Sequence, residues 1–153
     1  MLTKRIIACL DCNNGRVIKG IQFQNHEDIG DATTLAQKYS NSADELVLYN
    51  ITSSADGKTV SYQWIRKISK SVNIPFCIAG GIRTLQEADN ILNNGADKIS
   101  INTPALENPK IIDEFVKKFG SQAVVVGIDT KKINGINTIL SVGRMIISVM
   151  NFK

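Results

Sequence analysis

Short apolar runs alternate with amphipathic segments along the first 130 residues or so. The apolar runs are bounded by turn residues and predict strands at 6–10, 46–49, 76–79 and 123–128, and 98–101 follows the third helix as the fourth strand. Between them, apolar residues at helical spacing predict helices at 32–39, 60–72, 85–95 and 109–120. Strands that alternate with helices are typical of a parallel sheet covered by helices.

Local signals support the boundaries of these elements. Asp31 and Thr84 stand directly before two of the helices and predict N-caps, and Pro109 opens the last helix. Residues 12–31 form a polar segment too long for an ordinary βα turn, with one hairpin strand predicted at 17–23. A loop of that length is typical of a functional segment.

The repeating pattern ends near residue 132. The segment 133–153 has a turn at 134–135, a strand-like run at 138–140, an apolar run at 145–150 and no acidic residue. A complete (β/α)8 TIM barrel typically needs about 250 residues. We therefore expect an α/β fold over 1–132, a partial barrel of four βα units plus a fifth strand, followed by a tail at 133–153 without this pattern.

Composition narrows the function classes. The chain has 43% hydrophobic and 21% charged residues, a net charge of +4 and an isoelectric point near 9.0, with its lysines scattered among acids. This favours a globular protein that binds no nucleic acid. With three cysteines, no signal-peptide pattern and no apolar run of about 18 residues, we expect a cytoplasmic protein without a membrane segment.

Cys9 and Cys12 form a Cys-x-x-Cys pair without a second pair, and the chain has one histidine, His26. A metal or redox site would need more ligands than these. We therefore interpret them as strand-end cysteines and expect no metal or cofactor.

Two aspartates close the first and fifth predicted strands. Asp11 follows 6–10, and Asp129 follows 123–128, about four βα units of roughly 30 residues later. Active sites of such barrels lie at the carboxyl ends of the strands. The two acids are therefore candidates for a general acid/base pair across the barrel mouth. Alternatively, each simply caps the loop after its strand.

A second group indicates phosphate binding at the same end. Gly81 belongs to a Gly-Gly pair after the third strand, and Asn102 and Thr103 follow the fourth. Glycines let backbone N–H groups approach a phosphate closely. A plain tight turn is the alternative. Lys19, on the long first loop, is placed to reach an anionic ligand, although an exposed lysine is more often only solvated.

Charged residues also begin several strands at the opposite end. Arg5, Glu45 and Lys98 precede or start their strands, at the bottom of the predicted barrel. On residue type and position alone, they predict a stabilising ring of ion pairs.

Five segments together resemble a known family: 1–11, 14–20, 43–47, 95–102 and 120–129. They closely resemble the cyclase subunit of imidazole glycerol phosphate synthase, HisF, of histidine biosynthesis. The resemblance runs from Met1 to about Lys132 and does not include the last 21 residues. It implies a (β/α)8 enzyme that uses ammonia from a glutaminase subunit, HisH. The reaction converts a phosphorylated ribotide into imidazole glycerol phosphate and aminoimidazole carboxamide ribotide.

The resemblance also implies roles for individual residues. Asp11 and Asp129 match the catalytic acid and base. The substrate would be bound by Lys19, Asn50, Gly81, Asn102 and Thr103. Asn50 stands where the family usually has an aspartate, so a carboxylate near the site is replaced by a neutral amide. Arg5, Glu45 and Lys98 match the ammonia gate, and Asp97 and Gln122 lie near the glutaminase interface.

Three hypotheses on the function of the chain follow from the sequence. The first is a cyclase subunit truncated to about its N-terminal half, without the strands of a second phosphate site. The second is a non-catalytic half-barrel that binds phosphate, forms a homodimer or docks on a glutaminase. The third is the related sugar isomerase of the same pathway, which the motifs at 98–102 and 120–122 disfavour.

Overall fold

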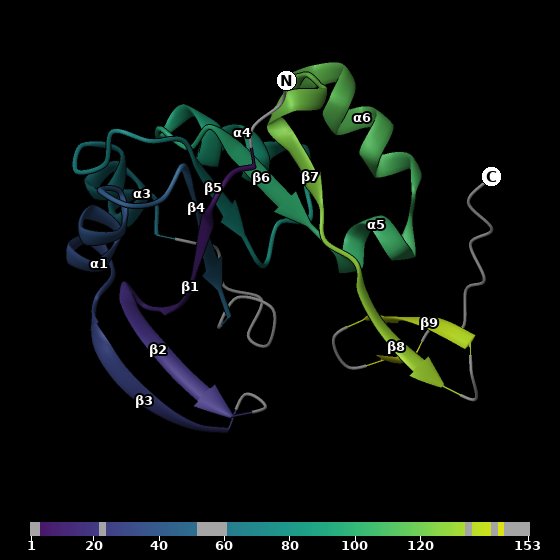
Figure 1. Cartoon of the computed structure of the whole chain (residues 1–153). Coiled ribbons are helices and arrows are strands. Elements are labelled where there is room, and N and C mark those ends of the chain that lie inside the picture. Colours follow the sequence, from purple (N-terminus) through teal and green to yellow (C-terminus); the bar gives the residue numbers. More distant parts are fainter. Residues whose placement is uncertain (1–3, 22–23, 52–60, 134–135, 142–143, 146–153) are drawn as a thin grey trace.

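The computed structural model describes residues 4–21, 24–51, 61–133, 136–141 and 144–145. Within these ranges a seven-stranded sheet has the order β3-β2-β1-β4-β5-β6-β7, and a three-stranded sheet has the order β10-β9-β8. Figure 1 shows the smaller sheet beyond the end of β7, away from the main sheet. No helix in the described ranges is long and apolar enough to cross a membrane.

The centre of the main sheet consists of parallel strands. They are β1 (Ile7–Asn13), β4 (Glu45–Asn50), β5 (Phe76–Ala79), β6 (Lys98–Ile101) and β7 (Val124–Val126). All five predicted strands are confirmed, and two of the differences at their ends bear on the positions of the aspartates. The first strand continues past residue 10, so Asp11 lies within it, and the fifth stops at Val126, before Asp129.

Helices connect these strands: α1 (Ala32–Tyr39), α3 (Tyr62–Ser69), α4 (Leu85–Asn93), α5 (Thr103–Glu107) and α6 (Lys110–Phe119), with the 3-10 turn η1 (Ser121–Ala123). Both predicted caps are confirmed. Asp31 accepts a hydrogen bond of 2.9 Å from the Thr34 backbone N–H, and Thr84 forms a capping box with Glu87. The second helix is shorter than predicted. The five-residue helix α5 was not predicted, because it is too short to show helical periodicity.

The segment 12–31 is more regular than the predicted loop with a single strand. It forms a hairpin of β2 (Arg16–Ile21) and β3 (Gln24–Asp31), which extends β1 through the pair Cys12↔Val17. The pattern missed β3 because this strand lies at the sheet edge and has few apolar residues. A bidentate contact supports it, since Arg16 donates to both carboxylate oxygens of Asp28.

The last described residues form β8 (Asp129–Ile133), β9 (Ile136–Ser141) and β10 (Arg144–Met145) in an antiparallel sheet. The strand-like run at 138–140 is confirmed within β9. The predicted turn at 134–135 lies outside the described residues, as does most of the apolar run at 145–150. Strand β8 crosses residue 132, where we expected the regular pattern to end.

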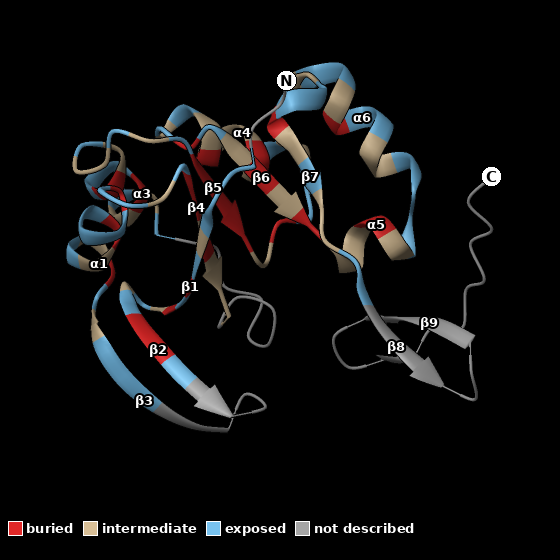
Figure 2. Ribbon diagram, viewed as in Figure 1, coloured by how far each residue is buried: buried red, intermediate tan, exposed pale blue. Residues whose placement is uncertain are grey.

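The two faces of the parallel sheet differ in burial. Alternate residues of β4, β5 and β6 pack against the helices at 0–2% exposure: Leu46, Leu48, Phe76, Ile78, Ile99 and Ile101. The strand registers place another row, Asp11, Tyr49, Ala79 and Ser100, on the opposite face. Figure 2 shows β5, at the centre of the sheet, in the colour of buried residues. The predicted partial (β/α) barrel is therefore confirmed, with its helices outside and with Asp11, Tyr49 and Ser100 on its inner face.

Candidate active site

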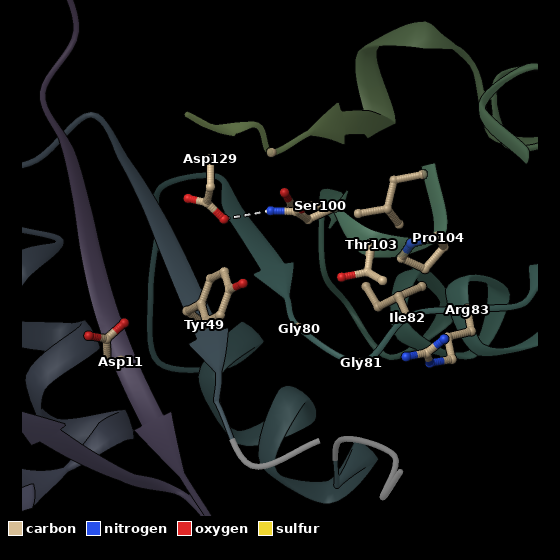
Figure 3. Close-up of a pocket in the computed structure, with 13 residues that line it drawn as sticks. Asp11, Tyr49, Gly80, Gly81, Ile82, Arg83, Ser100, Thr103, Pro104 and Asp129 are labelled. Atoms are coloured by element: carbon tan, nitrogen blue, oxygen red, sulfur yellow. Dashed lines mark hydrogen bonds between the residues drawn. The ribbon is translucent and has the colours of Figure 1, made fainter. Parts of the chain in front are cut away.

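A pocket of about 330 Å³ lies at the carboxyl ends of the parallel strands. The side chains and loops come from β1, β4, the β5–α4 loop, the β6–α5 junction and the β7–β8 connection. The lining residues include Asp11, Tyr49, Gly80, Gly81, Arg83, Ser100, Asn102, Thr103 and Asp129. The structure thus brings together the two aspartates and the three residues expected to bind phosphate (Figure 3).

The two aspartates reach the pocket by different routes. Asp11 belongs to β1, where strand alternation turns it to the inner face. Asp129 begins β8, and the Gly127 N–H donates to the Ile101 carbonyl at 2.8 Å, which keeps the chain beside β6 after β7 has ended. Asn102 Nδ2 then donates to Asp129 Oδ2 at 2.8 Å. This hydrogen bond fixes the orientation of the Asp129 carboxylate.

The glycine loop has a backbone that requires glycine. Gly80 and Gly81 have φ of +94° and +74°, and a Cβ on Gly80 would lie 2.2 Å from the Asn50 carbonyl oxygen. The following N–H groups, of Arg83 and Thr84, donate to the Glu87 carboxylate. In the described part of the chain, the N–H groups of Gly81 and Ile82 have no acceptor. They can therefore bind an anion in the pocket.

Tyr49 is a pocket residue that the sequence analysis missed. Burial raises the pKa of its phenol, and the charges of Asp129 and Asp11 raise it further, so the hydroxyl stays protonated at neutral pH. Its position follows from the strand register, in which Tyr49 pairs with Asp11 across β1 and β4, and no local sequence signal indicated this pairing. Two more lining residues, Arg83 and Ser100, were also missed.

Two residues expected at the substrate are not among those that line the pocket. Lys19 is exposed on β2, and Asn50 ends β4 with its carbonyl facing Gly80. Alternation along β4 explains the difference, since it turns Tyr49 rather than Asn50 to the inner face.

A cluster of charges lies at the other end of the strands. The Glu45 side chain is 6% exposed and accepts from Lys98 Nζ, and Arg5 Nη1 lies 3.6 Å from its second oxygen. The structure therefore brings together all three residues expected at the gate. Asp97 and Gln122 lie near the same end: Asp97 accepts from the Phe76 N–H at 2.9 Å, and Gln122 is exposed in η1.

The cysteines lie on different faces of the sheet. Cys9 is exposed on the inner face, while Cys12 is 1% exposed against the helices. Burial raises the pKa of Cys9, and it raises the pKa values of Cys12 and Cys77 to about 12. Their thiols therefore stay protonated at neutral pH, the form that binds metals poorly. Among the described residues, no group of three or more His, Cys, Asp or Glu side chains could hold a metal ion.

Comparisons with known proteins give a consistent result. The sequence model of the family described as "Histidine biosynthesis protein" matches residues 5–149. Three curated relatives are each named "Imidazole glycerol phosphate synthase subunit HisF". The chain is 59% identical to the Francisella philomiragia protein, 57% to that of Campylobacter lari and 56% to that of Aliivibrio fischeri.

The matched regions cover 88%, 86% and 85% of this chain, and 53%, 52% and 51% of the three relatives. The chain thus spans about half the length of the curated relatives it matches. The family match includes most of the tail at 133–153. From this match and from the arrangement of its strands and helices, the chain belongs to the histidine biosynthesis protein family, and within it resembles the HisF subunits.

Proposed function

We propose that the pocket belongs to the cyclase active site of imidazole glycerol phosphate synthase, a lyase of histidine biosynthesis. One observation carries the proposal: Asp11 and Asp129 line the same pocket as the Gly80–Gly81 loop and Asn102. Two acids beside an anion-binding loop fit a phosphorylated substrate that reacts by proton transfer. The names of the relatives support this activity.

The two acids would share the proton transfers of ring closure. One carboxylate accepts a proton from the attacking nitrogen, and the other, protonated, delivers a proton to the leaving group. Asn102 holds Asp129 in place, whereas Asp11 has no hydrogen-bond donor within the described residues. A phosphate on the N–H groups of Gly81 and Ile82 would position the reacting atoms between them.

The charged cluster would act as the ammonia gate. Arg5, Glu45 and Lys98 lie at the amino ends of the strands whose carboxyl ends form the pocket. Ammonia released by a glutaminase subunit, HisH, would pass this cluster and travel along the inner face. Asp97 and Gln122, near the same end, would contact that partner.

The proposal is tested with the purified chain, alone and with a glutaminase subunit. Cyclisation of the bis-phosphorylated ribulosyl substrate is followed by absorbance with ammonium salt as nitrogen source. We expect Asp11→Asn to lower the rate at least about 100-fold, because a general acid/base group typically contributes 10²- to 10⁴-fold. The matched control, Asp113→Asn at an exposed position of α6, should keep the wild-type rate. An unchanged rate in Asp11→Asn would contradict the catalytic assignment.

A second candidate rests on the inner face of the sheet. Ile7 and Val125 are 52% and 40% exposed there. A non-catalytic protein that binds phosphate would bury this face in a homodimer or against a glutaminase. A compact dimer in size-exclusion chromatography that binds phosphate and never cyclises the substrate would favour this function over the cyclase.

A further inference from the structure

Tyr49 lies in the pocket, and none of the roles expected from the sequence was assigned to it. It pairs with Asp11 in the register of β1 and β4, and its other neighbour in the sheet is Ala79 of β5. Ala79 has a small side chain, so the phenol ring has room above the sheet on that side. Figure 3 shows the ring near both Asp11 and Asp129, with its hydroxyl directed into the pocket.

The Tyr49 hydroxyl has no hydrogen-bond partner among the described residues. Its ring is only partly buried, and the hydroxyl borders the open pocket. A phenol placed for packing alone would gain nothing from an oxygen at this point. A partly buried tyrosine hydroxyl usually finds a partner, and here the pocket is where that partner would lie.

The surrounding groups determine which partner suits the hydroxyl. The nearby carboxylates of Asp11 and Asp129 and the unpartnered Asn102 Oδ1 are hydrogen-bond acceptors. Tyr49 contributes a donor that stays protonated, because burial and the two carboxylates all raise the pKa of its phenol. A ligand between the two acids therefore meets a neutral O–H donor on its β4 side.

We infer that the Tyr49 hydroxyl donates a hydrogen bond to an uncharged carbonyl or hydroxyl oxygen of a sugar phosphate bound between Asp11 and Asp129. This inference rests on the proposed function for the class of ligand. The Gly80–Gly81 loop binds the phosphate, and Tyr49 recognises the sugar portion. Tyr49 is thus a binding residue that selects a ligand with an oxygen at this position.

The test uses the full chain, with ammonia omitted so that the substrate is not consumed. Isothermal titration calorimetry measures the Kd of the bis-phosphorylated ribulosyl substrate and, separately, of inorganic phosphate. In Tyr49→Phe we expect the substrate Kd to rise about 2- to 10-fold, the loss of one neutral hydrogen bond. The Kd of inorganic phosphate should not change, because the glycine loop keeps its geometry.

The matched control is Tyr39→Phe, which removes the same hydroxyl from a side chain 41% exposed on α1 and should leave both Kd values unchanged. Equal substrate Kd values for wild type and Tyr49→Phe would overturn the inference. Parallel losses for substrate and phosphate would also overturn it, since they would report a distorted pocket. Wild type that fails to bind the substrate overturns both the inference and the proposed function.

One result separates the two proposals. In one case, Tyr49→Phe weakens substrate binding selectively, and wild type shows no turnover when ammonium is added. This pair of results supports the role of Tyr49 and contradicts the cyclase activity. The reverse pair, turnover with no effect of Tyr49→Phe on substrate binding, supports the cyclase and overturns the role of Tyr49.

Discussion

Acidic side chains at the two ends of the parallel strands differ in burial and in their partners. At the amino ends, Glu45 is buried and contacts both Lys98 and Arg5. At the carboxyl ends, Asp11 and Asp129 are exposed, and the one hydrogen bond recorded for this pair within the described residues comes from the neutral amide of Asn102. All three acids lie on or beside the inner face of the sheet.

Solvation explains the difference. A carboxylate taken out of water needs a cation and hydrogen bonds to offset several kcal/mol of lost hydration. A carboxylate that keeps its water needs no partner, so its charge and its protons remain available to a ligand. The stability of the amino-end cluster therefore depends on its own ion pairs. The shape of the pocket depends on backbone geometry, and its two carboxylates remain available to contact a ligand.

The largest expected effect tests the backbone at the carboxyl ends. Gly80→Ala should destabilise the fold by about 3 kcal/mol or more, because a Cβ would lie 2.2 Å from the Asn50 carbonyl at a φ of +94°. Gly127→Ala is the matched control in the same pocket, where the nearest atom to a Cβ is 3.6 Å away. Urea unfolding measures both, and equal midpoints would contradict the dependence on backbone geometry.

The second-largest loss of stability should follow from removing a charge at the amino ends of the strands. Lys98→Met leaves Arg5 as the one cation paired with the buried Glu45 among the described residues. We expect a loss of about 2–3 kcal/mol, below the usual range for a buried pair because Lys98 is 24% exposed. The control is Lys118→Met, whose pair with Asp89 lies at the surface and should contribute less than about 1 kcal/mol. Similar losses in the two variants would mean that burial of Glu45 does not set the cost.

A pH titration examines the thiol beside that cluster. Burial, then the charge of Glu45, raises the pKa of Cys77 to about 12, so the unfolded thiol loses its proton at lower pH than the folded one. The contribution of the Cys77 thiol to the free energy of unfolding is complete below about pH 9 and is lost as the pH rises toward 12. The slope approaches about 1.4 kcal/mol per pH unit. Cys77→Ala should show a flatter decline of unfolding free energy above pH 9, and identical slopes would count against this contribution.

The smallest effect belongs to an acid of the pocket. Asp11→Asn should change the free energy of unfolding by no more than about 0.5 kcal/mol, because the side chain is exposed and has no donor within the described residues. Glu45→Gln, the same chemical change at the amino ends, should cost more. Thermal unfolding compares the pair. A larger loss in Asp11→Asn would show that the pocket acids also stabilise the fold.

Most of the fold could be predicted because its signals are local. The strands 76–79 and 98–101 were predicted with the bounds they have. The first is a short apolar run, and the second carries isoleucine at alternate positions. Thr84 and Asp31 act through contacts three residues away in the chain. The strand β3 and the helix α5 were not predicted, because a polar edge strand and a five-residue helix have no detectable hydrophobic periodicity.

The candidate site was predicted in part. Residues at or just after the ends of the predicted strands, Asp11, Gly81, Asn102 and Asp129, meet in one pocket as expected from a parallel sheet. Tyr49 was missed in favour of its neighbour Asn50, because a shift of one residue exchanges the faces of a strand. Lys19 was placed by the reach of its side chain, and the structure holds it on the hairpin outside the pocket lining.

The sequence by itself determined the succession of strands and helices and the end of the sheet at which the polar residues gather. These depend on hydrophobic period and turn residues, which act over a few neighbouring positions. Only the tertiary structure decided which polar side chains face one another, such as Asn102 with Asp129 or Tyr49 with Asp11. Those contacts depend on the register between strands distant in the chain, and the register is set by how the whole sheet packs against its helices.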